Sequence, residues 1–335
     1  MSEAPLLRIN NVSQIFKTKK GPRPAVREVS LDINAGDVLC LVGESGSGKT
    51  TTARMAAALA KPTLGSIEYR GHDIAQMSHD DYIDFRKSVQ YVHQDPYASL
   101  NPIRSVYKTL AAPLRKHGLA RNDHDAWEQA CALLTEVNLT PPESYLQKFP
   151  HQMSGGQRQR VAVARALTLH PKLIIADEST SMLDVSIRVS MLDMLGKLRD
   201  DLGVGFMFIT HDLALAKYFG WRGKTAVMYL GRVVEFGNTP DVINDPKHPY
   251  TRALLNAVPE PDPDVAATKL PGGGLRSAEI PSLAHLPAGC TFHPRCPMYE
   301  EGLCEVSEPQ LVQLGNREVA CHVLERDLAR TSVDG

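Results

Sequence analysis

Residues 43–50 form a glycine-rich segment that constrains the fold more than any other part of the chain. The sequence Gly-Glu-Ser-Gly-Ser-Gly-Lys-Thr fits G-x-x-x-x-G-K-[ST], the pattern of a phosphate-binding loop. The apolar run Val38–Val42 before it predicts a buried strand, and residues 50–57 after it predict a helix whose N-terminal dipole favours anions. The order strand, loop, helix therefore predicts an α/β fold that binds a nucleotide.

The residue types in the loop suit a triphosphate. Glycines at three positions allow the backbone to curl so that consecutive N–H groups point inward. Lys49 adds a positive charge, and the Thr50 hydroxyl can bind Mg²⁺. The predicted ATP-binding residues of this segment are Gly43, Glu44, Ser45, Gly46, Ser47, Gly48, Lys49, Thr50 and Thr51.

Length and charge limit the classes of protein to consider. A chain of 335 residues fits one large α/β domain plus a smaller appendage. The formal net charge of -1 gives no basic field for nucleic acid, so no nucleic-acid partner is expected. No apolar stretch approaches the roughly 18 residues of a membrane span, and residues 1–5 lack the charged region followed by an apolar core that is typical of a secretory leader. We therefore expect a cytosolic chain unless a partner holds it at a membrane.

The pattern of apolar residues divides the chain into segments of different character. Residues 7–35 predict an antiparallel, half-exposed sheet, and the runs Gly65–Tyr69 and Val89–Val92 are expected to extend it. From about residue 95 to 150 the pattern becomes helical, which indicates an inserted helical subdomain.

Parallel α/β topology is predicted for the part that follows. The apolar runs Leu173–Ala176 and Gly205–Ile209 predict strands, with a helix near Ser186 to Leu202 between them. Residues 259–289 are rich in proline and glycine and are typical of a linker.

Two further segments carry groups that suit phosphate chemistry. Asp177 and Glu178 close a predicted strand, where Asp177 can hold Mg²⁺ through water and Glu178 can activate the attacking water. Paired acids are common at strand ends, and the phosphate loop upstream is what favours a functional role here. Ser154, Gly155, Gly156 and Gln157 precede an apolar helical run and offer either an anion site or a simple helix cap.

These motifs together resemble the ATP-binding cassette (ABC) ATPases. Met153–Gln157 matches the signature motif of that family, and it lies in the family order between the phosphate loop and the acidic strand. The resemblance implies an α/β fold with a RecA-like core, an antiparallel β subdomain and a helical subdomain at about residues 95–160. It also implies an ATP-hydrolysing domain over residues 1–258 and a small C-terminal extension over residues 259–335.

The resemblance assigns roles to residues that would otherwise be unremarkable. Gln94 takes the position of the glutamine that contacts Mg²⁺ and the attacking water, and His211 that of the switch histidine on the γ-phosphate. Asp184 matches the loop that crosses to the partner subunit, and Phe16 matches the aromatic residue that stacks on adenine. The catalytic set implied is thus Glu178, His211 and Gln94, with Thr50, Gln94 and Asp177 at the magnesium ion.

The family resemblance also implies partners. The signature of one subunit contacts ATP held by the phosphate loop of another, so a second ATPase subunit, identical or paralogous, is expected. Residues 94–102 and residues 248–255, with Val258 and Pro259, resemble the dipeptide/oligopeptide importer ATPases. That branch implies two transmembrane permease subunits, docked near Gln94 to Pro102, an extracytoplasmic substrate-binding protein, and a peripheral position on the cytoplasmic face of the membrane.

Four of the six cysteines lie in the last 46 residues. Cys290, Cys296, Cys304 and Cys321 are separated by five, seven and sixteen residues, wider than the C-x₂-C knuckles usual for structural zinc. Four thiolates suit a [4Fe-4S] cluster, which the subfamily resemblance favours, with zinc and unliganded thiols as alternatives. His293 and His322 are minor ligand candidates, whereas Cys40 and Cys131 are predicted to be inert core residues.

The primary hypothesis is an ATPase subunit of a peptide importer. The first alternative keeps the transporter but changes the cargo to nickel or oligosaccharide. The second is an ABC ATPase of DNA repair or translation that has no membrane partner.

Overall fold

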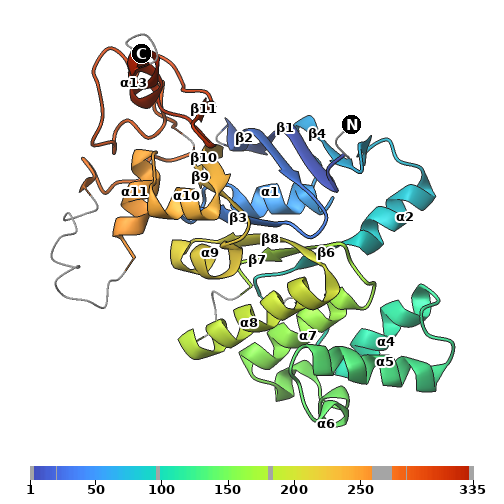
Figure 1. The fold of residues 1–335 in the computed structure, drawn as a ribbon. Helices are drawn as coiled ribbons and strands as arrows, with labels where there is room; N and C mark the ends of the chain where they lie inside the picture. The colour runs from blue at the N-terminus through green and yellow to red at the C-terminus, as the bar shows by residue number, and fades with distance from the viewer. Residues whose placement is uncertain are drawn as a thin grey trace. The chain divides into compact units, whose positions relative to one another are not determined.

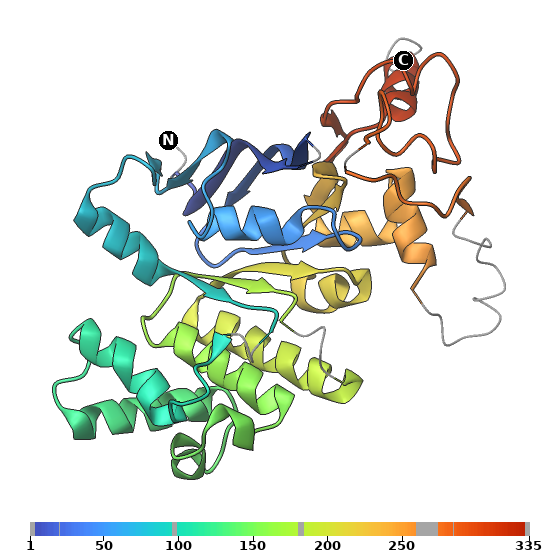
Figure 2. The same cartoon turned by 180° about the vertical axis from the view of Figure 1, so that it is seen from behind.

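The structure is a computed structural model that describes residues 4–19, 21–95, 99–179, 184–258, 274–283 and 285–331 (Figures 1 and 2). The chain divides into two compact units. The first contains Met1–Leu7, Ile33–Asp37 and Tyr69–Ile209, and the second contains Arg8–Asp32, Val38–Glu68 and Thr210–Gly335. Most of the predicted linker lies outside the described residues.

Parallel strands form the sheet of the first unit. Strand β7 (Leu173–Asp177) pairs in parallel with β6 (Val89–Val92) on one side and with β8 (Gly205–Thr210) on the other. Every residue of β7 and β8 is buried, as expected for strands covered on both faces. Helix α8 (Val185–Leu202) connects these two strands and confirms the predicted α/β alternation.

One strand was assigned to the wrong sheet. The sequence placed Val89–Val92 in the antiparallel sheet, but this strand pairs in parallel with β7, with Tyr91 opposite Ile175. It is half-exposed because it lies at the end of the sheet order, and a half-exposed run of four residues has the same pattern in either kind of sheet.

Helices and the short strand β5 make up the rest of the first unit, within the described residues. In Figure 1 the green helices α4, α5 and α6 lie together, which places the predicted helical subdomain. Ser105 and Asn122 cap α4 and α5 through side-chain oxygens. The remaining elements are β5 (His72–Asp73), α2 (His79–Ser88), α4 (Val106–Lys116), α5 (Asp123–Glu136), α6 (Pro142–Leu146), the 3₁₀ helix η1 (Pro150–Gln152) and α7 (Gly155–Leu167).

Two groups of strands lie in the second unit. In the first group β1 (Leu7–Thr18) lies between β2 (Gly21–Ile33) and β4 (Leu64–Tyr69). The strand order of the second group is β11-β12-β10-β9-β3, in which β9 pairs in parallel with β3 and antiparallel with β10. The strands of this group are β3 (Val38–Val42), β9 (Lys224–Tyr229), β10 (Arg232–Asn238), β11 (Val312–Leu314) and β12 (Arg317–Val319).

The C-terminal segment contributes two strands to this second group. Strand β12 pairs antiparallel with β10, with Val319 opposite Glu235, so residues far apart in sequence share the sheet that contains β3. The helices of the unit are α1 (Lys49–Ala56), α9 (Leu213–Gly220), α10 (Thr239–Asn244), α11 (Pro249–Asn256) and α13 (His322–Thr331).

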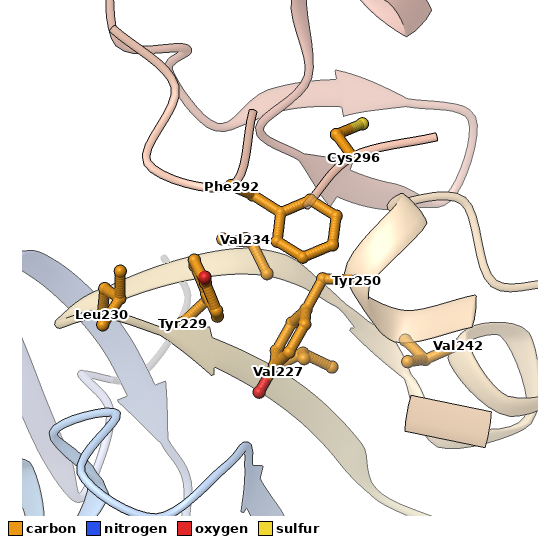
Figure 3. Close-up of a cluster of buried hydrophobic side chains, with 8 residues drawn as sticks. All are labelled: Val227, Tyr229, Leu230, Val234, Val242, Tyr250, Phe292 and Cys296. Carbon is orange, nitrogen blue, oxygen red and sulfur yellow. The ribbon is translucent and has the colours of Figure 1, made fainter. Parts of the chain in front are cut away.

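An aromatic cluster anchors the C-terminal extension (Figure 3). The Phe292 ring meets Tyr229 of β9 at 5.2 Å and Tyr250 of α11 at 5.5 Å between centroids, and the two tyrosines meet at 4.6 Å. All three are almost completely buried. The cluster consists of Val227, Tyr229, Leu230, Val234, Val242, Tyr250, Phe292 and Cys296.

A buried charge strengthens the same attachment. Glu235 of β10 is fully buried and accepts the backbone N–H groups of Lys247 and His248 at 2.9 and 3.0 Å. The Arg317 guanidinium of β12 lies 3.5 Å from that carboxylate. Because a buried carboxylate is costly unless it is paired and hydrogen-bonded, Arg317 and Glu235 depend on each other.

Within the described ranges, no helix combines the length and the hydropathy needed to cross a bilayer.

Replacing Phe292 with Ala should destabilise the second unit, because the substitution leaves a cavity beside the buried rings of Tyr229 and Tyr250. We expect a loss of about 3–5 kcal/mol in the free energy of unfolding, measured by urea denaturation. Phe16→Ala is the matched control, since Phe16 is 47% exposed and its removal should change stability by less than about 0.5 kcal/mol. Equal effects of the two substitutions would show that Phe292 does not anchor the extension.

Candidate nucleotide-binding and hydrolysis site

The phosphate loop follows β3 and leads into α1, as predicted. Glycine is required at two of its positions because a Cβ atom would collide with backbone: at Gly43 it would lie 2.1 Å from the Met228 carbonyl oxygen, and at Gly48 2.5 Å from that of Ala25. Gly48 also has a φ of +105°, in the left-handed region. The Gly231 N–H donates to the Ser47 carbonyl at 2.9 Å and fixes the curve of the loop.

Lysine and threonine lie where the sequence predicts them. The buried Lys49 ammonium donates to the Gly43 and Glu44 carbonyls at 2.7 and 2.9 Å, so its charge lies inside the curve of the loop. Thr50 is exposed in the first turn of α1, and a Cβ at Gly46 would meet nothing within 4 Å. The open face of the loop, the buried ammonium and the helix N-terminus fit a bound phosphate chain.

Glu44 has contacts that the sequence did not predict. Its N–H donates to the Tyr250 hydroxyl at 2.8 Å, and its carboxylate accepts two hydrogen bonds from the Arg295 guanidinium, at 2.8 and 3.0 Å. Burial raises the pKa of Tyr250, which keeps this hydroxyl protonated. Arg295 lies 251 positions from Glu44 in the sequence, and no local pattern connects them.

Two other predicted residues lie in the second unit. Phe16 is exposed on β1, as a residue that stacks on a ligand must be. His211 is exposed directly after β8, and the next residue, Asp212, caps α9 by accepting the Ala214 N–H at 2.7 Å.

Gln94 and Glu178 meet in the first unit. The Gln94 amide donates to the Glu178 carboxylate at 2.9 Å, which brings together two of the three predicted catalytic side chains. Glu178 has a φ of +41°, a strained conformation for a residue with a Cβ, and its N–H donates to the Ile209 carbonyl at 3.1 Å. Such strain gathers at functional sites.

Asp177 is oriented by Tyr91, a residue that the sequence did not single out. This carboxylate is 3% exposed and accepts a hydrogen bond from the Tyr91 hydroxyl at 2.6 Å. The bond orients Asp177 at the carboxyl end of β7, beside Glu178 in the chain. The parallel pairing of β6 with β7 brings Tyr91 there, and that pairing was not predicted.

The signature segment forms the start of α7. Ser154 is the exposed N-cap, and it exchanges hydrogen bonds with Gln157 at 3.0 and 3.3 Å in a capping box. A Cβ at Gly156 would lie 2.8 Å from the Ile187 side chain of α8. The exposed Asp184 precedes α8 and accepts the Arg188 N–H through its carbonyl, whereas residues 181–183 lie outside the described residues.

The four C-terminal cysteines lie in two adjoining apolar clusters. Cys290 and Cys296 pack with Phe292, whereas Cys304 and Cys321 pack with Val319. The Cys290 N–H donates to the Cys304 carbonyl at 2.8 Å. Burial, with a smaller contribution from the neighbouring cysteines, raises the pKa of Cys290 to about 11 and of Cys296 to about 12.

The structure contains the thiols of the predicted metal site but not its ligand geometry. Within the described part of the chain, no three His, Cys, Asp or Glu side chains are arranged to hold a metal ion. The minor candidates His293 and His322 bond through a ring nitrogen to the carbonyls of Cys290 and Ser307, each at 2.9 Å.

The two remaining cysteines differ from each other. Burial raises the pKa of Cys40 to about 12, as expected of an inert core thiol. Cys131 is only half-buried, so its assignment to the core was wrong: it lies on a side of α5 that is not fully covered.

Comparison with known families gives two matches. The model for "ABC transporter" matches residues 26–181, which include the phosphate loop, the signature and the acidic strand. The model for "Oligopeptide/dipeptide transporter, C-terminal region" matches residues 234–304, which include three of the four clustered cysteines.

Relatives match over nearly the whole chain. A putative peptide import ATP-binding protein of Brucella ovis is 41% identical over 311 residues, 93% of this chain and 95% of the relative. The di/tripeptide transport ATP-binding protein DppF of Pseudomonas aeruginosa is 41% identical over 91% of each chain. The putative oligopeptide transport ATP-binding protein YkfD of Bacillus subtilis is 39% identical over 96% of this chain and 97% of its own.

Solved structures support the same family. The ATP-binding cassette MJ0796, solved as a dimer in a post-hydrolysis state bound to ADP and Pi, has a TM-score of 0.63 and 28% identity, covering 70% of this chain and 98% of its own. CbiO1 of Clostridium perfringens, part of the transporter complex cbiONQ, has a TM-score of 0.62 and 26% identity, covering 72% and 92%. The chain therefore belongs to the ABC transporter ATPases, in the group that carries the oligopeptide/dipeptide transporter C-terminal region.

Proposed function

We propose that this chain is the ATP-hydrolysing subunit of an importer for dipeptides or oligopeptides. The observation that carries the proposal is the similarity over more than nine-tenths of the chain to ATP-binding proteins named for peptide transport. The match to the C-terminal region at residues 234–304 supports the same cargo class.

The phosphate loop would hold the triphosphate of ATP. The loop residues 43–51 would offer backbone N–H groups to the phosphates, Lys49 would offer its ammonium, and Phe16 has an exposed ring for adenine. A magnesium ion would neutralise charge on the phosphates, and Thr50, Asp177 and Gln94 are the residues that would hold it.

Glu178 would act as the general base in hydrolysis. Its contact with Gln94 fixes the carboxylate, and Gln94 would position the water from which Glu178 accepts a proton. His211 would contact the γ-phosphate, so that the arrangement of the catalytic residues would depend on whether the γ-phosphate is present.

A second ATPase subunit would complete each site. Ser154, Gly155, Gly156 and Gln157 of one subunit would contact ATP bound to the phosphate loop of the other, and Asp184 would lie at the crossing. Each charge-assisted contact is worth about 1.5–3 kcal/mol. Closure of the dimer would thus depend on the γ-phosphate, and hydrolysis would let the dimer open.

Two permease subunits would couple this cycle to transport. They would dock near Gln94 to Pro102, of which residues 96–98 lie outside the described part. An extracytoplasmic binding protein would deliver the peptide, and this chain would lie at the cytoplasmic face of the membrane. Within this family, nickel or oligosaccharide is the alternative cargo. The other alternative is an ABC ATPase of DNA repair or translation, and co-sedimentation of the chain with membranes would distinguish a transporter subunit from it.

Substitutions at two positions should separate ATP binding from hydrolysis. Glu178→Gln should retain ATP binding, hold the closed dimer, and lower turnover by on the order of 100-fold or more, since a general base contributes that much. Lys49→Ala should lose both binding and hydrolysis. Phosphate release and fluorescent ATP binding are the measurements, and normal turnover in Glu178→Gln would exclude Glu178 as the base.

We further propose that Cys290, Cys296, Cys304 and Cys321 hold a [4Fe-4S] cluster, with zinc as the alternative. Three buried thiols and one half-buried thiol in adjoining clusters support a soft metal centre, although the present arrangement is not that of a formed site. The cluster would stabilise the fold of a segment that has little hydrophobic core of its own. We favour this structural role over redox sensing.

Anaerobically purified protein should contain iron and acid-labile sulfide and absorb broadly in the visible range. Cys304→Ser should lose both, whereas Cys131→Ser should retain them because Cys131 lies on α5, in the other unit. One zinc per chain without sulfide would contradict the cluster, and metal-free wild-type protein would contradict both metals.

A further inference from the structure

The C-terminal extension contacts the phosphate loop through a partly buried ion pair. Arg295 and Glu44 form a fork-to-fork pair, with Nη1 to Oε2 at 2.8 Å and Nη2 to Oε1 at 3.0 Å. The side chains are 5% and 26% exposed, so water screens the pair only weakly. A bidentate pair restricts the direction of the Glu44 carboxylate as well as its distance.

Arg295 is itself held in place from several sides. Its guanidinium lies 5.7 Å from the centroid of the Tyr229 ring and 5.8 Å from that of Phe292. Its backbone N–H donates to the Phe292 carbonyl, and its carbonyl accepts the Arg276 N–H, both at 3.0 Å. The guanidinium therefore meets Glu44 from a fixed position within the aromatic cluster.

Glu44 places a negative charge in the loop that is proposed to hold the phosphate chain. Its carboxylate is negative, and it lies one residue after Gly43 in the loop that binds the most negative part of the nucleotide. Without a partner, this charge would repel the phosphates across a partly buried, weakly screened space. Arg295 both compensates the charge and directs the carboxylate toward the aromatic cluster.

The backbone at Glu44 is fixed from two directions. The Tyr250 hydroxyl accepts the Glu44 N–H, while the Lys49 ammonium binds the carbonyls of Gly43 and Glu44 from inside the loop. A shift of Glu44 would therefore move the carbonyls that position Lys49.

We propose that Arg295 is a positioning residue for ATP binding, which holds the phosphate loop in its binding conformation through Glu44. The C-terminal extension would thus set the affinity of the site for nucleotide, in addition to any structural role. The inference rests on the nucleotide-binding role proposed for the loop and is independent of the transported cargo.

The test is the steady-state ATPase kinetics of the full-length protein. Arg295→Ala should raise KM for MgATP by on the order of tenfold, since it removes charge-assisted hydrogen bonds and leaves a carboxylate near the phosphates. It should change kcat by less than about threefold, because the variant leaves Glu178 and Gln94 intact. Arg295→Lys should give an intermediate KM, since it keeps the charge but not the fork.

A second substitution distinguishes positioning from general destabilisation. Adding Glu44→Gln to Arg295→Ala removes the uncompensated charge, so KM should return toward that of Glu44→Gln alone. The matched control is Arg326→Ala, which breaks the pair with Glu300 elsewhere in the extension and should leave KM unchanged. If Arg295→Ala does not fold, Arg295→Lys with and without Glu44→Gln provides the same comparison.

Two results would overturn the proposal. One is an equal KM in Arg295→Ala and Arg326→Ala, and the other is a double variant whose KM is no lower than that of Arg295→Ala. An absence of ATP binding in the wild-type protein would instead refute the nucleotide role of the loop, so the two failures are distinguishable.

Discussion

Close backbone packing around the phosphate loop is the constraint on which the other features of the site depend. A side chain at Gly43 would overlap the Met228 carbonyl of β9, and one at Gly48 would overlap that of Ala25 in β2. The loop can keep its curve only while these strands keep their positions. The stability of the site is thus a property of the surrounding sheet as much as of the motif itself.

Because the loop depends on the surrounding strands, the C-terminal extension also contributes to the structure of the nucleotide-binding loop. Strand β12 pairs with β10, β10 pairs with β9, and β9 carries Met228, so the extension supports the loop through the sheet. It also contacts the loop directly through Arg295. The aromatic cluster around Phe292 joins the two routes, because its rings pack against β9 and hold the Arg295 guanidinium in place.

Local patterns predicted the parts of the fold that local physics determines. The strand before the loop, the helix after it and the alternation of β7, α8 and β8 all follow from apolar periodicity and glycine chemistry. Glu178 was identified by its position at a strand end, whereas Gln94 came only from the family resemblance, because nothing in its neighbourhood indicates a catalytic glutamine. Their hydrogen bond was visible only in the folded chain.

The features that were missed depend on contacts between distant residues. Tyr91 orients Asp177 only because β6 pairs in parallel with β7, and a half-exposed run of four residues does not specify that pairing. Arg295 resembles any arginine beside a cysteine until the fold brings it to Glu44. Long-range charge pairing leaves no periodic signal, so sequence patterns cannot reveal it.

Uptake of labelled dipeptides and oligopeptides tests the central claim most directly. Cells that carry the wild-type chain with its permeases would be compared with cells that carry Glu178→Gln at equal levels in the assembled complex. The account predicts that the variant loses peptide uptake, because dimer closure without hydrolysis cannot complete a transport cycle. Unchanged peptide uptake in the variant would contradict the assignment of this chain as the ATPase of a peptide importer.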